Sequence, residues 1–210
     1  MTHLVVGLGE VGQAIQEVFR CQGIDKGEKA EGEFDIIHIC IPYSKDFVKQ
    51  VKEYQKRYQP KYTVVHSTVQ VGTSRKLNAI HSPIRGLHPN LYEGIMTFPK
   101  FLGGEASGVA DEFRRCGLKV ILFDKPETTE LGKLLDTEYY RACIEFTLRA
   151  KKLCDEKNVP FSEAYTLFNL TYNEGYTQLG HSEYVRPTLQ PIMKTIGGHC
   201  LLPNKEIIKL

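Results

Sequence analysis

Several features that define particular classes of protein are missing from this 210-residue sequence. No apolar run approaches the roughly 18 residues that a membrane-spanning helix needs. The formal net charge is +2 and no segment carries a block of basic residues, which argues against a specialist in binding nucleic acid or membrane surfaces. Internal repeats and low-complexity tracts are also missing. What remains is a globular chain, long enough for one large domain or for a domain of about 120 residues with a smaller companion.

Two further absences concern the location of the protein. The amino terminus, MTHLVVGLGEVG, lacks the charged, apolar and small-residue segments of a signal peptide, because glycines interrupt its apolar stretch. The six cysteines have no paired spacing, which in a chain without an export signal indicates reduced thiols. We therefore expect a cytoplasmic protein. Most of its cysteines, and two histidines in or beside apolar strands, are expected to be structural: Cys21, Cys40, Cys116, Cys143, Cys154, His38 and His66.

Strand-like and helix-like segments alternate over residues 1–125. HLVV at the amino terminus and FDIIHICIPYS are apolar strands, and KDFVKQVKEYQKRY has the periodicity of an amphipathic helix. Further strands are expected in CQGIDKG, YTVVHSTV, AIHSP, FPKFLGG and LKVILF, with short helices in TSRKLNA and GVADEFRRC. The segment SPIRGLHPNLYEG is expected to be a loop. This alternation predicts an α/β fold with a Rossmann-type, mainly parallel sheet.

Residues 126–210 have a different character and predict an all-helical C-terminal domain. Apolar residues recur at helical spacing from position 131 to position 153, which indicates one long helix of roughly 27 residues, Glu130–Lys157. One or two more helices are expected in PFSEAYTLFNLTYNEGYTQLG. A loop, TIGGHCLLPN, follows near the end of the chain and contains Cys200.

The first strand is followed by a glycine turn, Gly7-Leu8-Gly9-Glu10-Val11-Gly12, which opens a helix. In this context the first glycine permits a tight turn, the second lets the backbone approach a pyrophosphate, and the third lets helix and strand pack closely. The helix N-terminus adds amide hydrogens and a partial positive charge. Asp25, at the end of the second strand, is placed to accept hydrogen bonds from ribose hydroxyls, which favours NAD over NADP. A purely structural glycine turn, and the related turn of SAM-dependent enzymes, remain alternatives.

Five motifs, taken in order, resemble those of the nucleotide-sugar 6-dehydrogenases, which include UDP-glucose, UDP-N-acetylglucosamine and GDP-mannose dehydrogenases. The motifs are CIPYS, HSTVQVGTSRKL, SPIRG, TTELGKLLDTEYYRA and GGHCLLPN. The resemblance covers nearly the whole chain. Family members continue with a second Rossmann-like domain that holds the nucleotide of the substrate, whereas the resemblance here stops at Leu210, so we expect a truncated form.

The resemblance implies a mechanism in which a first hydride transfer to the dinucleotide gives an aldehyde and a cysteine adds to it. A second hydride transfer then gives a thioester, which water hydrolyses. Matched position by position, it implies catalytic roles for Cys200, Lys133, Thr68 and, at a second acidic position of the family, His88. Thr137 stands where the family has an asparagine beside the lysine, and Arg85 is a candidate anchor for a phosphate or carboxylate. Two positions depart from the pattern: the glutamate expected after Ser82-Pro83 is Ile84, and the aspartate after the cysteine is Asn204.

The sequence thus predicts an NAD-dependent oxidoreductase that resembles a minimal nucleotide-sugar dehydrogenase and acts on a small molecule such as a sugar nucleotide. A dinucleotide-binding protein without oxidation activity, and a SAM-dependent transferase on the same fold, are the alternatives. No metal site is expected, since the spacing of His81, His88 and Cys200 matches no tight ligand motif. The residues expected around the dinucleotide are Gly7, Leu8, Gly9, Glu10, Val11, Gly12, Asp25, Ile41, Pro42, Ser67 and Thr68.

The long helix also leads to an expectation about assembly. It carries more apolar surface than one small domain can cover, and in the related family this helix forms the dimer. We therefore expect a homodimer through the long helix.

Overall fold

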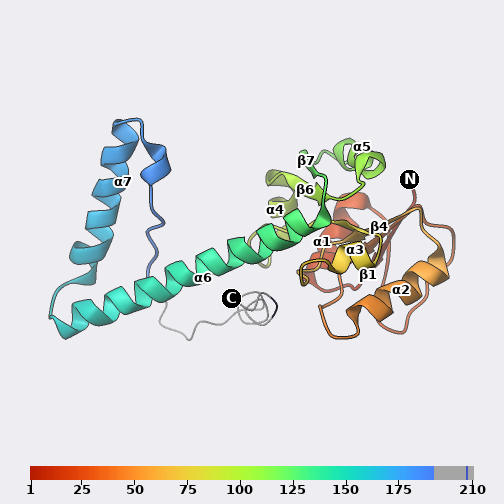
Figure 1. Ribbon diagram of the computed structural model, residues 1–210, viewed down its shortest axis with the longest axis horizontal. Helices are drawn as coiled ribbons and strands as arrows, with labels where there is room; N and C mark the ends of the chain where they lie inside the picture. The colour runs from red at the N-terminus through yellow and green to blue at the C-terminus, as the bar shows by residue number, and fades with distance from the viewer. Residues whose placement is uncertain (192–206, 208–210) are drawn as a thin grey trace. The chain divides into compact units, whose positions relative to one another are not determined.

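The computed structural model describes residues 1–191 and residue 207 (Figure 1). The chain divides into two compact units, Met1–Leu134 and Leu135–Leu210. The division falls within the long helix α6, Pro126–Glu156, so the first turns of this helix are grouped with the sheet.

The first unit is built on a seven-stranded sheet with the order β2-β1-β3-β4-β5-β6-β7. Apolar, β-branched residues dominate its central strands, as expected for strands that are buried on both faces. The strands are β1 (His3–Val6), β2 (Gln22–Ile24), β3 (Ile36–Ile39), β4 (Tyr62–Val65), β5 (Ile80–His81), β6 (Lys100–Gly103) and β7 (Val120–Phe123). All neighbouring pairs are parallel except β5 and β6, which are antiparallel. The predicted α/β class with a mainly parallel sheet is confirmed.

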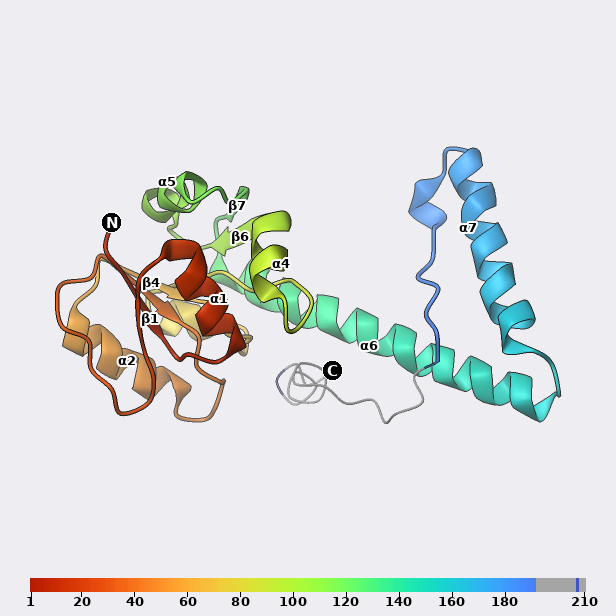
Figure 2. The ribbon, with the colours of Figure 1, turned by 180° about the vertical axis from the view of Figure 1, so that it is seen from behind.

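Helices cover both faces of the sheet, and Figures 1 and 2 show α2 on one side with α4 and α5 on the other. Helix α2 (Phe47–Tyr58) buries Phe47 and Val51 against alternate residues of the central strands. The opposite face is covered by α1, α4 and α5, which bury Ile15, Ile95 and Phe113 in a second apolar cluster. The helices are α1 (Glu10–Phe19), α2, α3 (Thr73–Lys76), α4 (Leu91–Thr97) and α5 (Ser107–Arg115).

The order of the strands locates the place where a ligand is expected. The chain runs from β1 to β2 on one side, and β3 lies on the other side of β1. In open α/β sheets this reversal leaves a crevice at the carboxyl ends of the strands, where ligands bind. The glycine turn follows β1 directly and therefore lies at this position.

One segment of the first unit differs from its prediction. The region SPIRGLHPNLYEG was expected to be a loop, but residues Leu91–Thr97 form the short helix α4. Leu91 and Ile95 are both buried, four residues apart on one face of the helix. Gly94, a poor helix former, obscured this helical pattern in the sequence. The glycine lets α4 pack closely against the preceding loop, because a Cβ on Gly94 would lie 2.5 Å from the Cα of Gly86.

The predicted long helix is confirmed as α6, which runs from Pro126 to Glu156. Beyond α6, the described part of the second unit contains a π-helical segment η1 (Ser162–Leu167), α7 (Phe168–Gln178) and a 3-10 turn η2 (Ser182–Tyr184). Thr147 of α6 lies 3.2 Å from the hydroxyl of Tyr165, which is one of the buried residues of this unit. In the part of the chain that the structure describes, none of the helices is long and apolar enough to cross a membrane.

Candidate functional site at the carboxyl edge of the sheet

The glycine turn after β1 is held tightly against its neighbours. Gly7 has a positive φ of 94°, a conformation that favours glycine, and its N–H donates to the carbonyl of Ile24 at 2.9 Å. A Cβ on Gly12 would lie 1.7 Å from the carbonyl oxygen of Gly7, so only glycine fits there. The turn therefore brings the start of α1 into direct contact with the end of β1.

The middle glycine of the turn is open. Gly9 precedes the ten-residue helix α1, and a Cβ placed on it would meet no described atom within 4 Å. The first backbone bond of the helix joins the N–H of Gln13 to the carbonyl of Gly9, so the amides of Glu10, Val11 and Gly12 precede the helical ladder. Amides that precede the helical ladder and the positive end of a helix dipole, beside an unobstructed backbone, make a site suited to a phosphate group.

Asp25 lies where the sequence predicted it, immediately after β2 and adjacent to the turn. Its side chain is exposed, and its Oδ1 accepts the N–H of Lys26 at 2.8 Å. The N–H of Asp25 itself donates to Glu28 at 2.7 Å. This tight turn fixes a carboxylate at the edge of the sheet, next to the strand end that carries Gly7.

The loops after β3 and β4 lie side by side at the same edge. Ser67 donates its hydroxyl to the carbonyl of Ile41 at 2.6 Å, and the N–H of His66 donates to the carbonyl of Ile39 at 2.9 Å. Thr68 is half-buried and Pro42 is exposed. The backbone N–H of Cys40 also donates to the carbonyl of Val6 at 2.8 Å. The structure therefore brings together, at one edge, the predicted cofactor residues that follow β1, β3 and β4.

The start of α6 is anchored to this edge by residues that the sequence reading missed. Glu130 is fully buried, and its carboxylate accepts the N–H groups of Gly72 and Ser74 at 2.6 and 2.7 Å. Thr129 lies 2.9 Å from His81 Nδ1, and His81 Nε2 lies 3.3 Å from the carbonyl of Ser67. Burial lowers the pKa of His81 to about 3, so the ring is neutral and can donate to Ser67 and accept from Thr129.

These anchors place Lys133 one turn further along α6, near the same edge. Lys133 is half-buried and close enough to His81 and Lys100 to lower the pKa of both, after the larger effect of burial. Thr137 follows four residues later, one helical turn along α6. The structure therefore brings Lys133 to the edge that carries Ser67 and Thr68.

Lys100 is a second buried cation that the sequence reading did not identify. It begins β6, is only 3% exposed, and donates to the carbonyls of Ser82 and Pro83 at 3.2 and 3.0 Å. Burial lowers its pKa to about 7, while the nearby Cys40 thiol acts in the opposite direction. The signal was present only as a lysine inside an apolar strand, FPKFLGG, and this pattern alone does not indicate that the lysine is buried.

The segment after β5 carries two predicted residues. Arg85 donates to the carbonyl of Pro99 at 2.6 Å and stacks over the Phe101 ring at 4.1 Å from the ring centre. At least one N–H group of its guanidinium therefore stabilises the fold. The exposed side chain of His88 contacts the carboxylate of Glu10, the first residue of α1, through its Nδ1 atom. His88 and Glu10 are thus brought together at the mouth of the glycine turn, and Ile84 is buried in the apolar core.

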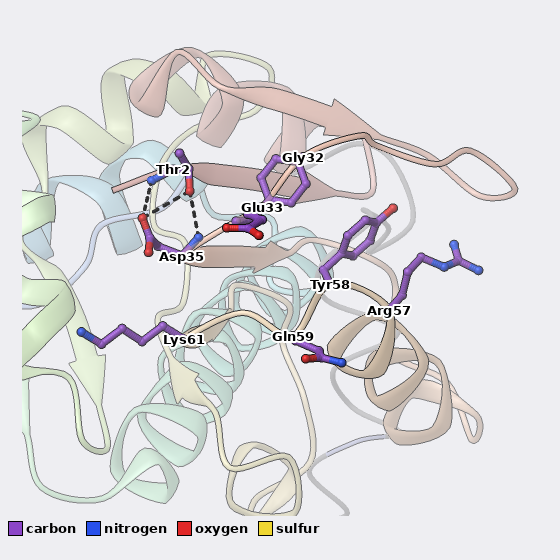
Figure 3. Close-up of a pocket in the computed structure, with 9 residues that line it drawn as sticks. Thr2, Gly32, Glu33, Asp35, Arg57, Tyr58, Gln59 and Lys61 are labelled. Carbon is purple, nitrogen blue, oxygen red and sulfur yellow. Dashed lines mark hydrogen bonds between the residues drawn. The ribbon is translucent and has the colours of Figure 1, made fainter.

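Cys200 and Asn204 lie outside the described residues. No group of three or more histidine, cysteine, aspartate or glutamate side chains in residues 1–191 is arranged to hold a metal ion. A hollow of about 700 Å³ opens at the opposite, amino edge of the sheet, where Asp35 accepts hydrogen bonds from Thr2 (Figure 3). None of the predicted site residues lines that hollow.

Comparison with known proteins agrees with this description of the fold. A scan of protein-family models and a search of curated proteins found no match to the sequence. Among solved structures, a UDP-D-ManNAc dehydrogenase from Pyrococcus horikoshii has a TM-score of 0.76 at 16% identity, over 99% of this chain and 63% of its own. The chain has the fold of the nucleotide-sugar dehydrogenases.

Other solved structures extend this similarity. A UDP-N-acetyl-mannosamine dehydrogenase from Staphylococcus aureus has a TM-score of 0.70 at 16% identity, over 96% of this chain and 63% of its own. The 3-hydroxyisobutyrate dehydrogenase of Mycobacterium tuberculosis has a TM-score of 0.63 at 14% identity, over 80% of this chain and 69% of its own. The chain spans about 63% of the length of the two nucleotide-sugar dehydrogenases that it matches.

Proposed function

We propose that this protein is an NAD-dependent dehydrogenase that binds its cofactor at the carboxyl edge of the sheet. The observation that carries the proposal is the glycine turn, in which Gly7 and Gly12 are packed against backbone while Gly9 is open. Gly9 and the first amides of α1 would hold the diphosphate of the dinucleotide. NAD, when bound, supplies the acceptor for a hydride.

The surroundings of the turn favour NAD over NADP. Asp25 directly follows β2 beside the turn and has an exposed carboxylate, which can accept hydrogen bonds from ribose hydroxyls and repels a 2′-phosphate. Ile41, Pro42, Ser67 and Thr68 follow the next two strands at the same edge and would line the nicotinamide side. These residues orient the cofactor by packing and by backbone hydrogen bonds.

For the substrate, the resemblance in fold supports a small molecule such as a sugar nucleotide. Lys133 lies near the cofactor edge, anchored through Glu130, and is suited to stabilise negative charge on a substrate oxygen. Arg85, with Thr137, is the candidate for holding the substrate. Cys200 remains the sequence-based candidate for the nucleophile, with Thr68 and His88 as partners that hold water and protons.

A second function is favoured by one observation. Ile84 occupies the position where the related family has a glutamate. Its hydrocarbon side chain cannot transfer a proton, and it is buried in the apolar core. A protein that binds the dinucleotide without oxidising a sugar would have this arrangement. A SAM-dependent transferase would use the same crevice with a different ligand.

The test of the proposed function is NADH formation with UDP-glucose, UDP-N-acetylglucosamine or GDP-mannose as the substrate. We expect absorbance of NADH to appear with one of them and to be lost in Cys200→Ala and strongly reduced in Lys133→Ala. Lys49→Ala, an exposed lysine on α2, is the matched control and should leave the rate unchanged. NAD binding without turnover on any of the sugars supports the binding protein instead, and saturable binding of SAM supports the transferase.

The assembly that we propose is a homodimer through α6. Three side chains at seven-residue spacing, Tyr139, Phe146 and Leu153, are 61%, 55% and 55% exposed. A stripe with this period is typical of a helix that packs against another helix. A second copy of the chain is the partner that would cover it. We propose a cytoplasmic location, on the basis of the unpaired cysteine spacing.

A further inference from the structure

Three histidines form a continuous hydrogen-bonded chain, here called the histidine ladder, in the core of the first unit. His3 Nδ1 lies 2.9 Å from His38 Nε2, and His38 Nδ1 lies 2.9 Å from His66 Nε2. At one end, His3 Nε2 lies 3.2 Å from Glu112 Oε1. At the other end, His66 Nδ1 lies 2.8 Å from the carbonyl oxygen of Ser82.

The ladder runs obliquely across β1, β3 and β4, from the amino ends of the strands to their carboxyl ends. His3 is the first residue of β1, while Val5 is the residue that pairs with His38 in β3. His66 follows the end of β4, so each step moves two residues toward the carboxyl edge. The rings stack with centres 5.2 Å apart at each step, and His38 and His66 are buried.

Apolar residues shield the central rings of the ladder from solvent. Phe19 of α1 stacks on His3 and His38 with ring centres 4.7 and 4.6 Å away, and Phe113 of α5 lies against His38. In such surroundings a missing hydrogen bond is costly, because no water replaces it. The number of protons in the ladder therefore matters.

The two ends of the ladder create a mismatch between the number of hydrogen-bonded links and the number of protons on neutral rings. A carbonyl oxygen and an ionised carboxylate are both acceptors only. The four links, Glu112 to His3, His3 to His38, His38 to His66 and His66 to Ser82, need one proton each. Three neutral imidazoles carry one N–H each, so one link lacks a proton whenever all three rings are neutral and Glu112 is ionised.

We propose that the histidine ladder is a binding site for a single proton, shared by three rings, which couples the amino edge of the sheet to the carboxyl edge. Uptake of that proton completes all four links. A second proton is excluded, because five protons for four links would place two N–H donors against each other. The proposal concerns these residues alone and does not depend on the proposed function.

The charges around the ladder determine which link is open when the rings are neutral. The titratable groups that face it from neighbouring elements are the terminal amine of Met1, Asp35, His81, Lys100, Glu112 and Arg115. An N–H that donates to the carboxylate of Glu112 is stronger than one that donates to a carbonyl. The open link is therefore the one between His66 and Ser82, at the end where Lys100 opposes positive charge.

The open link has a consequence at the carboxyl edge. Lys100 Nζ and His66 Nδ1 both lie within hydrogen-bond distance of the carbonyl oxygen of Ser82, and Lys100 also donates to the carbonyl of Pro83. When the ladder is neutral, Lys100 is therefore the donor that holds the Ser82–Pro83 segment. Protonation of the ladder adds the second donor. The segment that leads to Arg85 is in this way held more firmly at low pH than at high pH.

The test is nuclear magnetic resonance of the full chain labelled with ¹⁵N in its imidazole rings, titrated with acid over the range in which it stays folded. We expect the nitrogens of His3, His38 and His66 to shift together at one midpoint, with a total uptake of one proton. Glu112→Gln provides an amide that donates to His3 Nε2, so all four links are complete with neutral rings and the shared titration is lost. Glu17→Gln, an exposed glutamate on α1, is the matched control and should keep it.

Two results would overturn the proposal. One is separate titration of the three rings in the native chain, or no titration of any of them before unfolding. The other is a shared titration that persists unchanged in Glu112→Gln. If Glu112→Gln does not fold, the proton count of the native chain still decides between one shared proton and independent rings.

Discussion

Two glycines of the turn differ in the space around them, and this difference indicates that one is needed for packing and the other for ligand binding. A Cβ on Gly12 would overlap the carbonyl of Gly7, whereas a Cβ on Gly9 points into open space. We predict that Gly12→Ala destabilises the protein by about 3 kcal/mol or more, because backbone must move to make room. Gly9→Ala should fold with nearly unchanged stability. Thermal unfolding of both variants beside the native chain checks this, and equal melting temperatures for the two variants would contradict it.

Lys100 gives a prediction about pH. Its pKa is lowered to about 7 from 10.5 by burial, so above pH 7 the unfolded chain binds a proton that the folded chain does not. Burial of Lys100 therefore costs the most stability at and below pH 7, and this cost disappears as the pH rises toward 10.5. The slope is about 1.4 kcal/mol per pH unit.

Lys100→Met should remove this dependence. Denaturant unfolding between pH 7 and 10 is expected to show a flatter profile for Lys100→Met than for the native chain, and a higher stability at pH 7. Lys49→Met, on the exposed face of α2, keeps the native profile. Parallel profiles for all three proteins would mean that Lys100 is not a titrating buried group.

At the scale of secondary-structure elements, the first turn of α6 is the joint between the long helix and the sheet. Two glutamates of this turn differ in surroundings: Glu130 is fully buried on two backbone N–H groups, while Glu127 pairs with the exposed Arg75. We predict that Glu130→Gln lowers the free energy of unfolding by about 2 kcal/mol, because the carboxamide offers one acceptor oxygen for two donors.

Glu127→Gln is the matched control for this prediction, since exposed ion pairs contribute little. Its melting temperature should stay close to that of the native chain. Lys133, three residues beyond Glu130, should lose its placement in Glu130→Gln, so the rate of any sugar oxidation falls in that variant and not in the control. Equal stability of both variants would contradict the role assigned to Glu130.

The sequence predicts most elements of the sheet because their signals are local. The apolar runs at β1, β3 and β4 and the periodicity of α2 and α6 are recognisable without any tertiary contact. The antiparallel direction of β6 and the burial of Lys100 depend on tertiary contacts, which no local pattern encodes. Glu130 was missed for the same reason, since a helix pattern treats a glutamate as solvent-facing. The positions of the glycine turn, Asp25 and Thr68 follow from strand ends, and so were predictable.

At the scale of the whole molecule, the exposed stripe on α6 predicts association. In analytical ultracentrifugation we expect the native chain, of 23.9 kDa, to sediment as a dimer. Tyr139→Glu combined with Phe146→Glu places charge on the stripe and should give a monomer, because charge is costly in an apolar helix interface. Lys152→Glu, on the same helix and well exposed, should remain a dimer. A native chain that is monomeric at high concentration would rule out this interface.

The central claim is that the open backbone at Gly9 receives the diphosphate of NAD, and calorimetric titration of the full chain with NAD tests it most directly. We predict saturable binding with one NAD per chain, weaker binding of NADP, and no binding of SAM. Gly9→Glu, which adds bulk and negative charge at the open position, should abolish the heat of binding while the protein stays folded. A folded native chain that takes up no NAD, or a Gly9→Glu variant that binds it as well as the native chain, would contradict the account.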